Sequence, residues 1–383
     1  MNVSLNWAQD NSNVDITSIG ADSIVKKIGE QLGAVESVNY WGAKYNGIVV
    51  AMVVECEKHP DADKLSVCLI DDGGAVENVE RNENGLVRVV CGAPNVRVGL
   101  TVAWLPPGVT VPSTANDAEP FILGTRELRG IKSNGMLASA NELAISENHD
   151  GLLEITADSV GEENIKPGTP FKNLYGLDDT VIDCENKMFT HRPDCFGILG
   201  LARELAGTQN LKFVSPDWYL NSPEFIETTE LPLEVQVDTS LVPRFMAVAI
   251  SNITIAPSPT YIQATLSKVG IRPINNIVDI TNWLMYLTAQ PIHAYDYDKV
   301  KALSNGAPKL IARNSKSGEL LKLLNDKEIK LIDDSSIIIS TESDAVGMGG
   351  VMGGANTEVD SSTKNIILEI ASFDMYNIRK TAM

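Results

Sequence analysis

The sequence predicts a multidomain α+β protein in which a strand-rich region lies between segments that mix helices and strands. Three runs, at 59–71 (HPDADKLSVCLID), 89–96 (VVCGAPNV) and 128–139 (LRGIKSNGMLAS), each join turn residues to alternating apolar residues. Each is therefore expected to be a turn that leads into a strand. Strands alternate with helices from residue 236 onward. The 383 residues suffice for roughly two or three domains of ordinary size.

The first 39 residues are expected to form a short strand, a polar turn and a helix. Apolar residues recur at near-helical spacing from about Ser18 to Leu32, and Gly33 is typical of a helix stop. This segment is too short to fold alone, so we expect it to pack against residues around 160–205.

A second compact region is expected from about residue 177. It contains a strand from Thr180 to Cys184, a turn, and a helix that Asp194 can cap and Gly207 can end. Farther on, Ser258 is expected to cap a helix that has Pro259 at its first position. The remaining elements are a helix at 275–289 and strands at 308–313, 335–340 and 364–371.

These elements predict four parts of the chain. They are a discontinuous small α/β domain at 1–39 plus 157–206, a β-barrel domain at 40–156, a linker at 207–235, and a further α/β domain at 236–383.

The net charge limits how this chain can bind a nucleic acid. Its formal net charge is −19, whereas a protein that binds nucleic acid by bulk neutralisation of phosphates is basic. Any contact with RNA must therefore be a local basic patch or be shared with a partner subunit.

Cysteine and histidine usage points to a reducing cytosol. The chain has five cysteines without a C-x-x-C pair, and its four histidines are scattered. This pattern predicts neither a disulfide framework nor a zinc site. No run of 18 apolar residues and no secretory leader is evident, so a cytoplasmic protein is expected.

The three runs at 59–71, 89–96 and 128–139 resemble, in this order, the EMAP-type tRNA-binding module, which is a five-stranded OB-fold barrel. The rest of the chain is similar to the β subunit of bacterial phenylalanine–tRNA ligase. The similarity rests on RPDCFGILGLARELA at 192–206, GIRPINNIVDITNW at 270–283, AQPIHAYD at 289–296, GMGGVMGG at 347–354 and IILEIASFDMYNIRKTA at 366–382.

Two departures from this family stand out. Thr190-His191 precedes the RPDC arginine where the family usually has Pro-Asn, which is a local change in a turn. The chain also stops at Met383, inside the last matched domain, whereas the family's β subunit is much longer. We therefore expect a partial gene product with a truncated editing domain.

Glu369 is the candidate that distinguishes tyrosine from phenylalanine. It lies in the apolar run NIILEIAS, where strand alternation puts it on one face with Ile367 and Ala371. A buried acceptor there would discriminate strongly, since a ligand without a hydroxyl leaves it unpaired. The pattern alone favours a solvent-facing glutamate. The resemblance instead implies the glutamate that senses the tyrosine hydroxyl.

The resemblance implies further residues of this editing pocket. His293 lies near the scissile ester and Thr281 on the pocket helix, while Gly349 and Gly353 form a wall that stays small, and Arg244 lies at the start of the domain. From the sequence alone, His293 is a structural or surface histidine. The glycines of GMGGVMGG are plain turns by the same reasoning, and they match neither a P-loop nor G-x-G-x-x-G. No nucleophile–base dyad is evident, so we expect water to attack the ester directly.

Four basic residues lie within or beside the barrel motifs and are the candidates for RNA contact: Lys64, Arg126, Arg129 and Lys132. Each taken singly is more simply a solvated surface residue, and the motifs could equally serve packing.

These observations predict a β subunit that binds tRNA(Phe) and hydrolyses mischarged tyrosyl-tRNA(Phe). The resemblance implies an α subunit as partner in a heterotetramer of two α and two β chains. It places aminoacylation, with its ATP and Mg²⁺, on the complete enzyme, so that this chain itself needs no cofactor or metal. The alternative is a free-standing RNA-binding or assembly module without hydrolytic activity.

Overall fold

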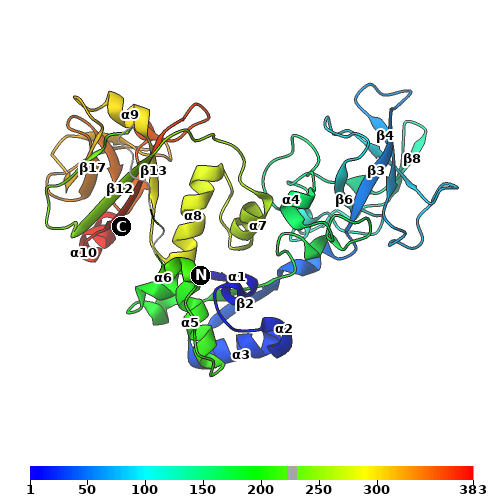
Figure 1. Cartoon of the computed structure of the whole chain (residues 1–383), viewed down its shortest axis with the longest axis horizontal. Coiled ribbons are helices and arrows are strands. Elements are labelled where there is room, and N and C mark those ends of the chain that lie inside the picture. The colour runs from blue at the N-terminus through cyan, green and yellow to red at the C-terminus, as the bar shows by residue number, and fades with distance from the viewer. Residues whose placement is uncertain (222–223, 225–230, 383) are drawn as a thin grey trace. The chain divides into compact units, whose positions relative to one another are not determined.

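The computed structural model describes residues 1–221, 224 and 231–382, and its contacts divide the chain into two compact units (Figure 1). Unit 1 comprises Met1–His191, Ala202–Val214 and Pro259–Pro273, and unit 2 comprises Arg192–Leu201, Ser215–Ser258 and Ile274–Met383. The middle of the predicted linker at 207–235 lies outside the described residues. The predicted domain boundaries stay a prediction.

A five-stranded antiparallel sheet forms the strand-rich part of unit 1. Its order is β5 (Val87–Cys91), β4 (Ser66–Asp71), β3 (Val49–Lys58), β6 (Thr101–Leu105) and β9 (Met136–Leu137). The end strands β5 and β9 contact each other, so the sheet curls into a nearly closed barrel. Alternate side chains, among them Val53, Ile70 and Trp104, fill its interior. A separate hairpin pairs β7 (Thr125–Leu128) with β8 (Ile131–Asn134).

Unit 1 also contains a three-stranded antiparallel sheet, whose strands come from segments that precede and follow the barrel in the sequence. Strand β10 (Thr180–Cys184) lies between β1 (Asn2–Ser4) and β2 (Val35–Tyr40). The short helix α1 (Leu5–Asp10) follows β1 directly.

The predicted helix from Ser18 to Leu32 is interrupted. Gly20 has φ +86°, which ends α2 (Ile16–Ile19) and begins α3 (Ala21–Gln31). A single continuous helix is therefore wrong, because this backbone conformation lies outside the α region.

Two further expectations about helix ends are corrected. Helix α5 (Ile198–Thr208) begins after a short 3₁₀ helix that contains Asp194, and it includes Gly207. Helix α7 (Thr260–Lys268) has Pro259 as its N-cap residue. The Ser258 hydroxyl instead donates to Asp279 Oδ2 at 2.5 Å.

Helix α7 supplies a buried ion pair within unit 1. Lys268 Nζ lies 2.7 Å from Asp179 Oδ2, and both side chains are almost fully buried. Asp179 also accepts hydrogen bonds from the Ser4 hydroxyl and the Asn6 backbone N–H. By contrast, the pair of Lys172 and Asp178 is partly exposed.

Unit 2 is built around two sheets. In the antiparallel three-stranded sheet, β20 (Ile366–Ser372) lies between β12 (Arg244–Ile250) and β13 (His293–Asp296). The five-stranded sheet has the order β11 (Glu234–Val237), β14 (Lys309–Asn314), β17 (Ile337–Ser340), β18 (Ala345–Met348) and β19 (Met352–Gly353). Buried side chains of both sheets share one core, among them Tyr295, Ile337, Val346 and Ile367.

Unit 2 also contains the helices α6 (Asp217–Leu220), α8 (Asn276–Thr288), α9 (Tyr297–Ala302) and α10 (Met375–Ala382) and the hairpin of β15 (Leu320–Lys322) and β16 (Glu328–Lys330). The structure confirms the predicted helix at 275–289 and the three predicted strands to within two residues.

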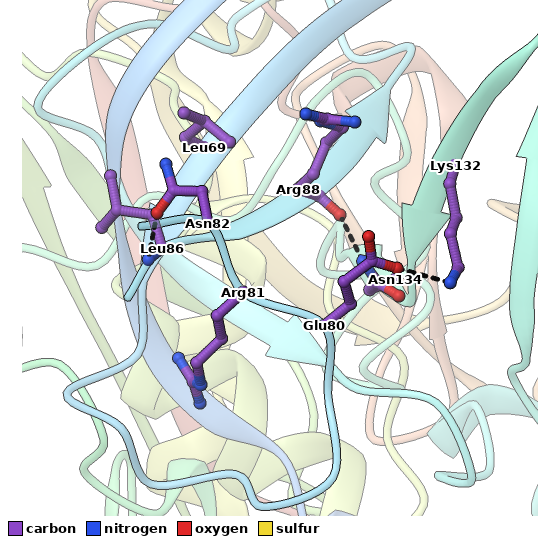
Figure 2. Close-up of a pocket in the computed structure, with 8 residues that line it drawn as sticks. All are labelled: Leu69, Glu80, Arg81, Asn82, Leu86, Arg88, Lys132 and Asn134. Atoms are coloured by element: carbon purple, nitrogen blue, oxygen red, sulfur yellow. Dashed lines mark hydrogen bonds and ion pairs between the residues drawn. The ribbon is translucent and has the colours of Figure 1, made fainter. Parts of the chain in front are cut away.

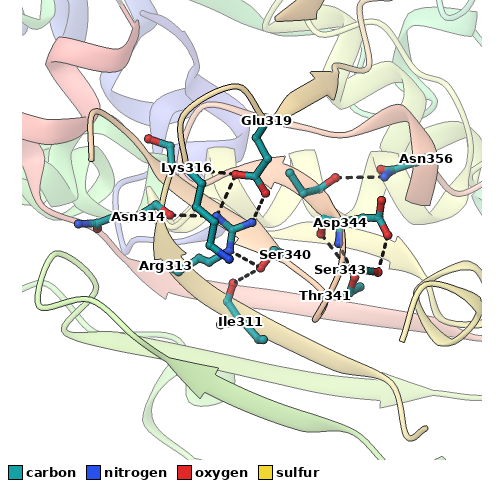
Figure 3. Close-up of polar contacts among 12 residues, drawn as sticks. Ile311, Arg313, Asn314, Lys316, Glu319, Ser340, Thr341, Ser343, Asp344 and Asn356 are labelled. Carbon is teal, nitrogen blue, oxygen red and sulfur yellow. Dashed lines mark hydrogen bonds and ion pairs between the residues drawn. The ribbon is translucent and has the colours of Figure 1, made fainter. Parts of the chain in front are cut away.

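A polar network holds one loop of unit 2 against the five-stranded sheet. Arg313 donates to Glu319 through both terminal nitrogens and to the Ser340 hydroxyl through Nε (Figure 3). Arg313 and Glu319 are mostly buried, and the hydrogen bonds from Arg313 lower the pKa of the Glu319 carboxyl against the opposing effect of burial. The network therefore fixes the loop after β14.

No helix in the described part of the chain is long and apolar enough to cross a bilayer.

Candidate functional site

A cavity of about 240 Å³ lies in unit 2, where the middle of β20 meets β13 and the glycine-rich segment 347–353. We call it the Glu369 cavity. Its wall is mostly apolar, and its only titratable side chains among the described residues are Glu369, His293 and Tyr295.

Glu369 is buried, with 6% of its surface exposed, so the alternative of a solvent-facing glutamate does not hold. Burial raises the pKa of its carboxyl to about 7, although a hydrogen bond from Tyr295 opposes this effect. The Tyr295 hydroxyl donates to Glu369 Oε2 at 2.5 Å. The carboxylate thus lies ready as a hydrogen-bond acceptor in an apolar environment.

His293 lies directly across from Glu369 in the register of β13 and β20. Its ring packs edge-on against Tyr295, with the ring centroids 4.4 Å apart. Burial lowers the pKa of the His293 imidazole to about 4. The imidazole is therefore neutral near pH 7, so one ring nitrogen can donate a hydrogen bond and the other can accept one.

Glycines form one wall of the cavity because other side chains lie too close to their backbone for a Cβ to fit, and in one case because the backbone turns there. A Cβ on Gly353 would lie 2.5 Å from His293 Nε2, and one on Gly349 would lie 2.9 Å from Ile337 Cγ2. Gly350 is the turn residue, with φ +68°. Side chains at 349 and 353 would thus collide with the residues around them.

Two other predicted site residues are not among the residues that line this cavity in the described structure. Thr281 is buried on α8, and its hydroxyl donates to the Val278 carbonyl at 2.8 Å. Arg244 is exposed at the start of β12. Met285, four residues beyond Thr281 on the same helix, does line the cavity.

Sequence reasoning missed Tyr295, Met285 and Phe373 as lining residues. The signal for Tyr295 was present, since it lies two residues after His293 and strand alternation puts both on one face. No local sequence pattern predicted that Met285 or Phe373 would line the cavity.

The four basic residues of the barrel region do not share one pocket. Lys64 borders a groove of about 630 Å³ together with Lys58, Ser66 and Arg97. Lys132 instead borders a pocket of about 60 Å³ and pairs with Glu80 at 2.5 Å (Figure 2). Arg126 and Arg129 belong to the β7–β8 hairpin: Arg126 lies 5.2 Å from the Phe121 ring centre, and Arg129 is in its turn.

Several motif residues of the barrel hold loops in place. His59 Nδ1 accepts from the Asp61 N–H, which leaves Nε2–H to donate to the Leu128 carbonyl at 3.1 Å. Asn95 exchanges two hydrogen bonds with the Leu152 backbone. Gly135 has φ +77°, and a Cβ there would run into the Leu105 carbonyl. The motifs therefore serve packing, whether or not they also contact RNA.

Comparison with known proteins matches both units. The family described as "B3/4 domain" matches residues 241–383, and the family described as "Putative tRNA binding domain" matches residues 48–163. The chain is 33% identical over its whole length to a protein of Protochlamydia amoebophila named phenylalanine--tRNA ligase beta subunit, of which it covers 44%. It is 36% identical to the protein of that name from Desulfotalea psychrophila, of which it covers 43%.

Among solved structures, an N-terminal fragment of the phenylalanyl-tRNA synthetase beta-subunit from Pyrococcus horikoshii is 14% identical, with a TM-score of 0.28 over 52% of this chain and 58% of that chain.

Both matched domains and the named relatives thus show that the chain is similar to proteins named as a subunit of an aminoacyl-tRNA ligase. Over the whole of this chain, the similarity is to the bacterial phenylalanine–tRNA ligase β subunit. The chain spans less than half the length of the curated relatives it matches.

Proposed function

We propose that the Glu369 cavity is the editing site of a phenylalanine–tRNA ligase β subunit, where tyrosyl-tRNA(Phe) is hydrolysed. The observation that carries this proposal is a buried carboxylate in a small apolar cavity. A tyrosine side chain would bring a hydroxyl to that carboxylate. Phenylalanine would leave the carboxylate without this partner, which costs roughly 1–3 kcal/mol.

The residues of the cavity suit direct attack by water on the aminoacyl ester. Its described lining contains no serine, threonine, cysteine or lysine that could form a covalent intermediate. In this proposal the neutral His293 imidazole orients the ester or the water, and the absence of side chains at Gly349 and Gly353 leaves room for the aminoacyl group. Thr281 remains a proposed residue of the editing pocket, and Arg244 remains a proposed substrate-binding residue.

The barrel of unit 1 is proposed to be an OB-fold that binds tRNA, with Lys64, Arg126, Arg129 and Lys132 as candidate contacts. The net charge of −19 indicates that this chain alone binds tRNA weakly and that useful affinity requires the α subunit. Aminoacylation, with ATP and Mg²⁺, is proposed to take place in the complete cytoplasmic enzyme. No group of three metal-ligating side chains occurs among the described residues that could hold the ion here.

Hydrolysis of tyrosyl-tRNA(Phe) by the complete α/β enzyme tests the editing assignment. Glu369→Ala is expected to reduce hydrolysis tenfold or more, while phenylalanylation is nearly unchanged because that site is proposed to lie on the other subunit. Glu328→Ala, which removes an exposed strand glutamate of the same unit, is the matched control. Undiminished hydrolysis in both Glu369→Ala and His293→Ala would contradict the assignment and favour an RNA-binding or assembly module.

Filter binding of tRNA to the chain itself tests the barrel. Lys64→Ala and Arg129→Ala are expected to weaken binding and each to reduce the slope of log K against log salt by about one. Lys330→Ala, an exposed lysine of β16, should leave both quantities unchanged. Tight binding with little dependence on salt would contradict the proposed local contact.

A further inference from the structure

The hydrogen bond between Tyr295 and Glu369 occupies one side of the carboxylate that is proposed to recognise the ligand. The Tyr295 hydroxyl donates to Oε2, and both side chains are buried. Among the described residues, no hydrogen bond reaches Oε1. One oxygen of Glu369 is therefore held by the protein, and the other has no protein partner.

Strand geometry explains how Tyr295 reaches Glu369. Tyr295 lies opposite Ile367 in the register of β13 and β20, so Glu369 is its diagonal neighbour on the same face of the sheet. The edge-on contact with His293 fixes the Tyr295 ring on one side, and Gly347 lies next to its hydroxyl. The phenol is thus built into the wall of the cavity.

We propose that Tyr295 is a positioning residue of the Glu369 cavity: its hydroxyl fixes one carboxylate oxygen of Glu369, so that the other oxygen is presented as the single acceptor for the phenol of a bound ligand. This inference rests on the proposed function only in its choice of ligand, a tyrosyl group. The placement of the carboxylate by Tyr295 is independent of any hydrolytic activity.

The charge state of Glu369 supports this role. Burial raises the pKa of Glu369 to about 7, and the hydrogen bond from Tyr295 is the interaction that opposes the rise. Within the described lining, the other titratable group is His293, which burial keeps neutral near pH 7. Without the Tyr295 hydroxyl, Glu369 would be protonated over a wider pH range and would present a weaker acceptor.

Titration of Glu369 in the chain itself tests the proposal. Carbon-13 NMR of labelled glutamate carboxyls follows the group, and Glu369→Gln identifies its signal. In Tyr295→Phe the midpoint is expected to rise by roughly one to two pH units. Tyr297→Phe is the matched control, because Tyr297 is also a buried tyrosine but donates to the Pro232 carbonyl. An unchanged midpoint in Tyr295→Phe would overturn the proposal.

The affinity for 4-methylphenol is a second measurement, and it would not change if Tyr295 had only a structural role. At pH 7, Tyr295→Phe should bind this probe roughly five- to fiftyfold more weakly than wild type. At pH 9, where Glu369 is largely ionised, a loss of roughly threefold or more should remain, because the carboxylate is no longer fixed. Toluene, which lacks the hydroxyl, should bind both proteins equally at both pH values. Equal affinities of the two proteins at pH 9, or a loss of affinity that extends to toluene, would overturn the positioning role.

These outcomes are separable from those of the proposed function. If the titration and the phenol binding behave as expected but the complete enzyme does not hydrolyse tyrosyl-tRNA(Phe), the editing assignment fails while the role of Tyr295 stands. If hydrolysis is present but Tyr295→Phe leaves the Glu369 midpoint unchanged, the reverse holds.

Discussion

Gly353 and His293 approach each other so closely that a Cβ on the glycine would lie 2.5 Å from His293 Nε2. The position of the imidazole in the Glu369 cavity therefore depends on the absence of a side chain on the neighbouring strand β19. Strands β13 and β19, which are about sixty residues apart in the chain, come into contact here.

Gly353→Ala should displace the half-buried His293 ring and expose more of it to solvent. Because burial is what lowers the pKa of His293 to about 4, the imidazole should then titrate closer to its ordinary value of 6.5. Proton NMR of the histidine ring measures this shift. Gly306→Ala is the control, since no atom lies within 4 Å of a Cβ placed there. A titration that is unchanged in Gly353→Ala would show that the wall yields without moving His293.

Glu369→Gln should change how stability depends on pH. The folded pKa of about 7 exceeds the unfolded value of 4.5, so the contribution of Glu369 to stability is fully present below pH 4.5 and is lost as the pH rises through 7. The stability of Glu369→Gln relative to wild type should therefore rise between pH 4.5 and 7, by up to about 3 kcal/mol. Urea unfolding across this range measures the difference.

His293 changes the stability with pH in the opposite direction to Glu369, over an overlapping pH range. Its folded pKa of about 4 lies below the unfolded 6.5, so its contribution is present above pH 6.5 and is lost as the pH falls through 4. The two slopes offset each other in wild type, and Glu369→Gln should expose the histidine slope. A difference between the proteins that does not vary with pH would contradict the raised pKa of Glu369.

Gly135→Ala should destabilise the barrel severely. The substitution adds a Cβ that lies 3.0 Å from the Leu105 carbonyl carbon and still closer to its oxygen, at a backbone φ of +77°. Gly130→Ala has a similar φ of +82° but open space around the Cβ, so it carries only the conformational cost of about 1–2 kcal/mol. Thermal unfolding of both variants separates the steric effect from the backbone effect. Equal losses in the two would argue against the clash.

Lys268→Met should leave the buried Asp179 carboxylate without its ion partner. Removing one member of a buried pair typically costs about 3–5 kcal/mol, because the remaining charge stays desolvated. Lys172→Met, which removes a lysine from the partly exposed pair with Asp178, should cost less than about 1 kcal/mol. Urea unfolding provides the comparison, and similar costs for both would show that Asp179 is already satisfied by Ser4 and Asn6.

The sequence predicted the local elements well where periodicity was strong. The helix at 275–289 and the strand around Glu369 are both present, and alternation correctly put Glu369 on one face with Ile367 and Ala371. The predictions were wrong where a backbone angle or a distant partner decides the outcome. The spacing of apolar residues predicted one continuous helix, but Gly20 divides it into two. Ser258 was expected to cap α7, but its hydroxyl donates to Asp279 instead.

The site was predictable only in part for the same reason. The resemblance implied His293 and Glu369, and the fold brings both to one cavity. The bond from Tyr295 to Glu369 links residues 74 positions apart, and no local pattern specifies which strands pair over that distance. Pairing is decided by the burial of both strands in a common core, which becomes visible only in three dimensions.

The central place of β20 in its sheet has a consequence for synthesis of the chain on the ribosome. Strands β12 and β13 are both made long before β20, yet in this sheet each of them pairs with β20. Until residues 366–372 emerge, both nascent strands present unpaired edges that can join other chains. The strand that carries the proposed recognition residue is thus also the one that ends this aggregation-prone interval.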